Sequence, residues 1–155
     1  MKRLLLISCS DCKNTSPEPL SAIERYNGMV YRIMRKARRE GYWPRNTDVL
    51  IVSAQYGLIS EDTPIGRYDQ KMTKARSLEL QQSVSCFLDE MLKEGHYDEI
   101  FINVGKMYMQ SVSASTELDR VRSVGLVKEA AGGIGMRLQQ TKDWIRSQWK
   151  LDSGS

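Results

Sequence analysis

Two short apolar runs without polar interruption constrain the fold of this 155-residue chain most strongly. One covers residues 4–7, and the other covers residues 49–52. Runs of this length suit strands that are buried on both faces, as strands in parallel sheets are. Because a segment with apolar residues at helical spacing comes after each run, the chain predicts an α/β domain with a mostly parallel sheet.

The alternation predicts a single three-layer domain on a four-stranded sheet, with helices on both faces. Ser21 and Glu24 form a candidate capping box at the start of the first helix, and Gly41 is its candidate stop. A loop of about fifteen residues, from Gln55 to Asp69, is long enough to suggest a functional role. The expected strands are residues 2–8, the region around 49–52, 97–105 and 120–127, and the expected helices are 21–40, 74–94, 107–114 and one after the turn at 132–135.

Length, cysteine count and charge set further limits. We expect one domain over residues 1–150 and a disordered polar tail at 151–155. No apolar run approaches the ~20 residues that span a bilayer and no signal peptide is recognisable, so we expect a cytoplasmic protein without a membrane partner. Three cysteines favour reduced thiols, and a net charge of +4 permits nucleic acid as a partner without requiring it.

Polar or glycine-rich segments follow all four expected strands. Ligands bind beyond the carboxyl ends of the strands in open parallel sheets, so these segments are predicted to meet in one site. The candidate binding residues are Ser8, Ser10 and Lys13, then Ser53, Tyr56, Gly57 and Tyr68, then Asn103 and Lys106, and finally Gly132, Gly133 and Gly135.

Cys9 and Cys12 have the spacing of a zinc or redox motif. Zinc would need two more ligands, and Cys86 and the one histidine, His96, do not form a second pair in the sequence. We therefore expect neither a metal nor a cofactor. Cys9 is interpreted either as a nucleophile, with a thiolate stabilised by Lys13 or loop amides, or as a small residue packed beneath a ligand.

The long loop and the last glycine turn offer further candidates. Asp69 is the candidate acid, base or base-reading group, with a loop simply anchored by Tyr68 as the alternative. The turn at 132–135 opens a helix and suits an anion, although a tight turn needs the same glycines. One helix face is basic, which is typical of a solvated surface or of phosphate contacts; its residues are Arg32, Arg35, Lys36 and Arg39.

Four segments together resemble a known family. SCSDCK, YNGMVYRIMRKAR, VLIVSAQYGLI with PIGRYDQKMT, and GGIG with LQQTKDWI are similar to small uncharacterised YaaA-like domains of bacteria and phages, which are related to a domain of archaeosine synthase and tRNA-guanine transglycosylase proteins. The resemblance implies a substrate class of nucleobases, especially modified purines in nucleic acid. It also implies a fold like that of uracil-DNA glycosylases. The strand pattern alone permits either this fold or a Rossmann-like sheet. Relatives carry lysines after serine-cysteine-serine, whereas Asp11 and Cys12 precede Lys13 here.

The sequence and the resemblance together predict an enzyme that processes a nucleobase, nucleoside or nucleotide. The reaction would be glycosidic-bond cleavage or base modification, by an N-glycosidase or a nucleobase transferase, with Asp69 and Cys9 as candidate catalytic residues. Two alternatives stay open: a non-catalytic nucleic-acid or nucleotide-binding module, and a stress or defence accessory protein that acts through protein contacts.

Overall fold

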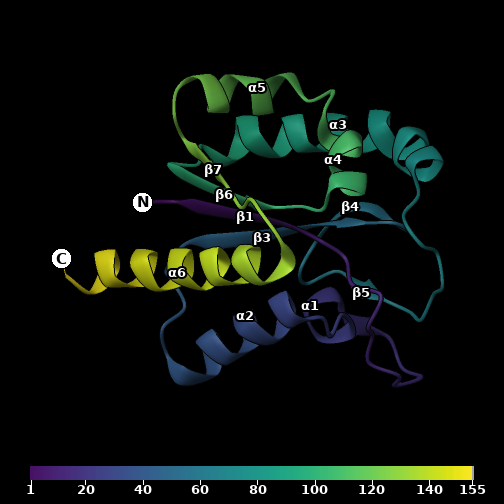
Figure 1. Cartoon of the computed structure of the whole chain (residues 1–155), viewed down its shortest axis with the longest axis horizontal. Helices are drawn as coiled ribbons and strands as arrows, with labels where there is room; N and C mark the ends of the chain where they lie inside the picture. Colours follow the sequence, from purple (N-terminus) through teal and green to yellow (C-terminus); the bar gives the residue numbers. More distant parts are fainter. Residues whose placement is uncertain (155) are drawn as a thin grey trace.

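A five-stranded sheet forms the middle layer of the molecule (Figure 1). The computed structural model describes residues 1–154. Sheet order is β4-β3-β1-β6-β7, and all neighbouring pairs are parallel except the β3–β4 pair. The prediction of a mostly parallel sheet is confirmed, but the count of four is wrong. The strands are β1 (Arg3–Ser8), β3 (Thr47–Ser53), β4 (Gly57–Ser60), β6 (Glu99–Asn103) and β7 (Val127–Glu129), with β2 (Leu20–Ser21) and β5 (Pro64–Ile65) paired separately.

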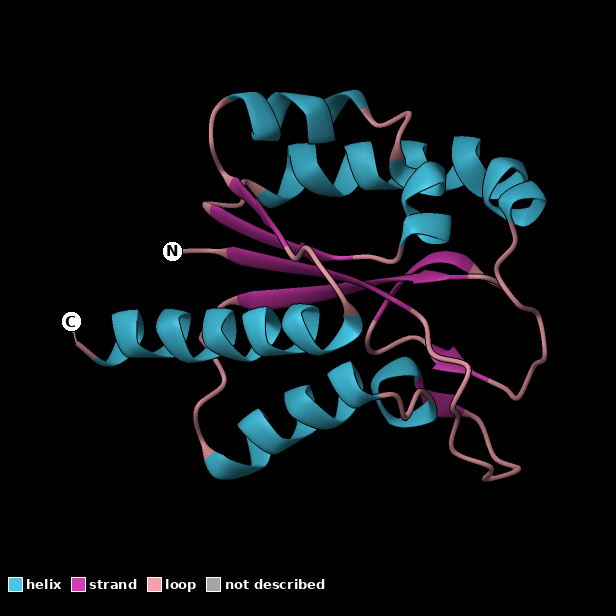
Figure 2. Ribbon diagram, viewed as in Figure 1, coloured by secondary structure: helices cyan, strands magenta, loops and turns pink. Residues whose placement is uncertain are grey.

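Helices cover both faces of the sheet, as Figure 2 shows. α1 (Ala22–Arg25), α2 (Met29–Glu40) and α6 (Ile134–Ser153) lie on one face, whereas α3 (Lys74–Gly95), α4 (Lys106–Val112) and α5 (Thr116–Ser123) lie on the other. The central strand β1 alternates between the two cores, because Leu5 packs in one and Leu6 in the other. Full burial on both faces explains the uninterrupted apolar runs. Within residues 1–154, no helix has the length and apolar character needed to cross a membrane.

The expected helix over residues 21–40 is divided in two. Ser21 lies in β2 and makes no side-chain cap, and the chain leaves the helical path at Tyr26 before α2 starts beyond Gly28. Tertiary contacts cause the break. The backbone of Tyr26 bridges to Lys13, and the N–H of Asn27 donates to the carbonyl of Cys12.

Two more expectations differ from the structure. The long loop contains β4 and β5, because Gly57 adopts a φ of +77° that lets the chain reverse and pair with β3. The fourth strand was expected over 120–127, but Arg120–Ser123 completes α5 and the strand begins at Val127. This segment is helical because Ser115 caps the start of α5 and because Leu118 and Val121 are buried at helical spacing.

The last helix extends into residues 151–155, for which the sequence predicts a disordered tail. α6 continues through Ser153, and only residue 155 of the expected tail lies outside the described residues. The reason is the buried guanidinium of Arg3, which bonds both carboxylate oxygens of Asp152 at 3.0 and 3.1 Å and the side chain of Gln148 at 2.7 Å. A buried cation requires such partners, and they fix the last turn of the helix.

Candidate functional site

A cavity of about 380 Å³ opens at the carboxyl ends of β1 and β6. The N-terminal parts of α2 and α6 form its apolar walls, through Met29, Val30, Ile134 and Leu138. The strand ends form its polar floor. Its remaining lining residues are Ile7, Ser8, Cys9, Ser10, Gly28, Tyr31, Asn103 and Gly105. Four residues predicted from the strand-end argument, namely Ser8, Cys9, Ser10 and Asn103, are therefore brought together.

Ser8 and Asn103 present complementary hydrogen-bonding groups in this cavity. The Oγ of Ser8 accepts the N–H of Gly105 at 2.9 Å, which leaves its own O–H free to donate. Asn103 donates its amide N–H to Thr141 Oγ1 at 3.1 Å, so within the described residues its carboxamide oxygen is available as an acceptor. The two residues lie on adjacent strands, since Ile7 is the register partner of Asn103. A nucleobase edge carries both donors and acceptors, so a cavity lined by one available donor and one available acceptor can hydrogen-bond it.

Cys9 lies beside a set of buried tyrosines. Its Sγ is 3.4 Å from the hydroxyl of Tyr108, and its backbone N–H donates to Val52. Burial, together with the neighbouring thiol, raises the pKa of Tyr108, and burial likewise raises the pKa of Tyr31. Both phenols therefore stay protonated at neutral pH. Tyr108 can donate a hydrogen bond to a Cys9 thiolate, whereas the Tyr31 hydroxyl already donates to the carbonyl of Ser8 at 2.7 Å.

Glycine begins each helix around the cavity. Gly28, Gly105 and Gly133 are the N-cap residues of α2, α4 and α6, and none of these helices has a side-chain cap or an acidic residue in its first turn. Thr73 and Ser115, by contrast, cap α3 and α5 through their side chains. The electropositive ends of α2 and α6 therefore face the cavity without a neutralising side chain.

A hydroxyl cluster joins the end of β3 to the long loop. The hydroxyl of Tyr26 donates to Ser53 Oγ at 3.1 Å, and the Tyr68 hydroxyl lies 2.6 Å from that of Tyr26 and 3.3 Å from Ser53 Oγ. Ser53 also accepts the backbone N–H of Tyr56. Each of the three hydroxyls can donate once and accept once within the cluster. This arrangement makes Tyr68 and Ser53 part of the scaffold that anchors the loop.

Asp69 lies in a second cavity rather than in the first. This cavity, of about 370 Å³, is lined by Asp69, Arg67 and Tyr68 from the long loop and by Asp11 and residues 13–15. The Nζ of Lys13 lies 4.4 Å from the centre of the Tyr68 ring, a cation–π contact. Consecutive parts of one loop line the two cavities, since residues 8–10 line the first, and Asp11 and residues 13–15 line the second. The structure thus divides the two candidate catalytic residues between neighbouring sites.

The other predicted site residues lie outside both cavities. The Tyr56 ring is exposed and packs edge-on against Tyr68, and Gly57 is buried beside Val84. Lys106 is exposed in the first turn of α4, and Gly132, Gly133 and Gly135 are exposed at the start of α6.

Sequence reasoning missed Tyr26, Tyr31, Tyr108 and Gly28 as site residues. The tyrosines occupy apolar helical positions, where their spacing indicates only core packing. Gly28 is informative in retrospect, because a Cβ there would lie 2.6 Å from Ser10 Oγ. A glycine just before a helical apolar pattern was the available signal for this close approach.

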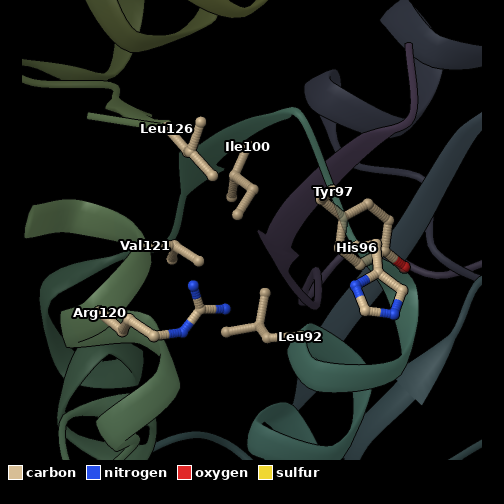
Figure 3. Close-up of a pocket in the computed structure, with 7 residues that line it drawn as sticks. All are labelled: Leu92, His96, Tyr97, Ile100, Arg120, Val121 and Leu126. Carbon is tan, nitrogen blue, oxygen red and sulfur yellow. The ribbon is translucent and has the colours of Figure 1, made fainter. Parts of the chain in front are cut away.

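A third cavity, of about 220 Å³, lies near the amino ends of β6 and β7 (Figure 3). Apolar side chains such as Leu92 and Ile100 surround it, and the Nε of Arg120, a lining residue, bonds Glu117 at 2.9 Å. His96, the single histidine, lines this cavity, whereas Cys9 lines the 380 Å³ cavity. Within residues 1–154, no group of three or more His, Cys, Asp or Glu side chains is placed to hold a metal ion.

Comparison with known proteins gives a family but no activity. The model of a family described as "Family of unknown function (DUF6884)" matches residues 4–143. A solved structure titled "Crystal structure of AF0587, a protein of unknown function" is 15% identical with a TM-score of 0.48, and the match covers 92% of this chain and 44% of that one. The chain thus spans less than half the length of that protein. No curated protein matches. None of these findings concerns YaaA-like domains or archaeosine synthase.

Proposed function

The chain belongs to the DUF6884 family of unknown function, and we propose that it binds a nucleobase or nucleoside at the carboxyl edge of its sheet and processes it. The observation that carries this proposal is the 380 Å³ cavity, whose lining includes the hydroxyl of Ser8 as a donor and the carboxamide oxygen of Asn103 as an acceptor. Its volume falls in the range of small-ligand sites, about 300–1,000 Å³, and its walls are apolar enough to stack on a planar ring. The likeness to YaaA-like domains and uracil-DNA glycosylases is part of this proposal, and the parallel sheet is compatible with it.

Cys9 is the proposed reacting group, since among the described residues it is the one nucleophilic thiol that lines the cavity. A hydrogen bond from Tyr108 would stabilise its thiolate, and the uncapped start of α2 would favour negative charge nearby. Asp69 enters the reaction only if the substrate extends around the 8–15 loop into the second cavity. Its carboxylate would then stabilise an oxocarbenium-like sugar during glycosidic cleavage.

A non-catalytic binding module is the second candidate. The observation in its favour is that, among the described residues, no acidic side chain lines the 380 Å³ cavity. Base-catalysed cleavage inside this cavity would therefore lack its usual carboxylate.

The first experiment measures thermal stability in the presence of free bases, nucleosides, nucleotides and modified purines. A ligand at about 100 times its Kd stabilises the fold by about 2.7 kcal/mol, and we expect such a shift from one base class. Gly28→Ala is expected to abolish the shift, because its Cβ would push Ser10 into the cavity, and Gly66→Ala is the matched control, since nothing lies within 4 Å of it.

Turnover of the stabilising ligand then separates the two candidates. Cys9→Ser should abolish product formation while the thermal shift is retained, if the thiol reacts. Retained turnover would reduce Cys9 to a packing role, and no turnover by the wild type would favour the binding module. No shift with any member of the panel would contradict the proposal itself.

A further inference from the structure

The positive charge of this chain is concentrated on one layer. α2 carries five Arg or Lys residues and one Glu, and α6 carries four Arg or Lys residues and two Asp. These two helices have a combined net charge of +6 in a chain whose total is +4, so the remainder has a net charge of −2. α3, on the opposite face, has three basic and four acidic residues. The basic layer is the one whose helices form the walls of the cavity.

Some of these cations serve the fold. Arg35 donates to the carbonyls of Ile23 and Tyr26, where the chain breaks between α1 and α2. Arg38 pairs with Glu61. These two arginines hold internal contacts, so a surface argument has to rest on other side chains.

Three other cations line the seam between α2 and α6. Lys36, Lys142 and Arg146 surround a small hollow there, together with Ile33, Tyr42 and Ile145, and we call these six residues the α2–α6 seam. All three cations are exposed, and Arg146 is held over the Tyr42 ring at 4.3 Å from its centre. Among the described residues, one carboxylate forms an ion pair with any of these three cations. It belongs to Glu40, and its oxygen lies 3.9 Å from Lys36 Nζ, a long distance for an ion pair.

The seam continues from the cavity along the same helix pair, which lies side by side in Figure 1. Val30 and Leu138 line the cavity, and Lys36 and Lys142 come six and four residues later. At 1.5 Å per residue these steps are about 9 and 6 Å along the helices. A single strand carries one phosphate per nucleotide, so a few nucleotides cover this distance.

We propose that the α2–α6 seam binds the phosphates of a single-stranded nucleic acid whose target base occupies the cavity. This inference rests on the proposed function, because the bound base sets where the strand enters the seam. A single strand fits because its base can enter the cavity without being flipped out of a duplex. Exposed cations along a groove are also the usual means of following a strand without reading its sequence.

The test is fluorescence anisotropy with labelled single strands of about ten nucleotides, within the usual range of binding-site sizes. RNA and DNA strands form separate arms, and a duplex forms a third. Three phosphate contacts on a single strand predict that affinity falls roughly 15–20-fold between about 50 and 200 mM salt. Lys36→Glu with Lys142→Glu should weaken binding at least tenfold and remove most of the salt dependence.

A charge-matched control is available on α3. Lys74→Glu with Lys93→Glu changes the net charge by the same amount on the opposite layer, and both lysines are exposed. Binding by this control should stay within about twofold of wild type at the same salt. Equal weakening by both double variants would overturn the inference, because it would show a non-local charge effect. Binding to anionic vesicles but to no oligonucleotide would overturn it in favour of a membrane surface.

Nucleoside binding separates this inference from the function on which it rests. The seam variant should retain the thermal shift given by a nucleoside, because the cavity is unchanged. A nucleoside shift without salt-dependent strand binding would overturn the seam and leave the proposed function standing. Strand binding that needs the seam, without any nucleoside shift, would overturn the proposed function and the placement of the base.

Discussion

Tyr68 illustrates how a single hydroxyl can hold a loop on a domain. Its hydroxyl lies within hydrogen-bond distance of both Tyr26 and Ser53, which end elements far apart in the sequence. Tyr68→Phe should destabilise the fold by about 1–2 kcal/mol, since it leaves two buried hydroxyls with one partner fewer. Denaturant unfolding checks this, with Tyr56→Phe as control, because that exposed ring should change stability by less than about 0.5 kcal/mol. Equal effects of the two variants would contradict the anchoring role.

At the residue scale, the sequence located the polar floor of the cavity but not its surroundings. Ser8, Cys9, Ser10 and Asn103 were identifiable because parallel strands end at one edge. The chemistry of a carboxylate makes Asp69 a candidate from the sequence, but it lies in a neighbouring cavity, because the long loop folds through β5 before reaching it. Sequence spacing carries no information on such a path.

At the level of elements, α6 depends on the clamp between Arg3 and Asp152. Asp152→Asn should destabilise the fold by about 1–3 kcal/mol, because the buried guanidinium loses its charged partner. Asp143→Asn is the matched control, an exposed aspartate on the same helix that bonds Gln139. Thermal unfolding of both variants tests the clamp, and a control as destabilised as Asp152→Asn would contradict it.

The clamp also predicts how stability depends on acid. Burial raises the pKa of Asp152, but the backbone N–H of Arg45 and the Arg3 guanidinium outweigh burial and lower it below its usual value. A lowered folded pKa gives stability that is present above the unfolded pKa of about 3.9 and is lost as pH falls below it. The stability difference between wild type and Asp152→Asn should therefore shrink in acid.

Elements differed from prediction wherever distant contacts outweighed local pattern. The helical spacing of residues 21–40 is real, yet contacts with the 12–14 loop interrupt it at Tyr26. β4 escaped notice because four residues in an antiparallel edge strand carry little periodic signal. The long buried strands and helices were predictable from the sequence. A strand buried on both faces is an uninterrupted apolar run, and a helix buried along one side has apolar residues at helical spacing.

For the whole molecule, the tyrosines predict a loss of stability in alkali. Burial raises the pKa of Tyr26 to about 12 and that of Tyr31 well above its usual value, against 10.0 for an exposed phenol. The neutral form is favoured in the fold, so this stability is complete below about pH 10 and is lost as pH rises toward the folded values. Each buried tyrosine that ionises only on unfolding lowers stability by up to about 1.4 kcal/mol per pH unit.

The measurement is denaturant unfolding of wild type and Tyr26→Phe at several pH values from about 8 to 11, across the ordinary tyrosine pKa. Lysines also titrate in this range and contribute equally to both proteins, so the informative quantity is the difference in slope. The variant should lose stability less steeply above pH 10, because one buried phenol no longer resists ionisation. Parallel curves would mean that the Tyr26 hydroxyl ionises as readily in the fold as in the unfolded chain, and would contradict its burial in the cluster with Ser53 and Tyr68.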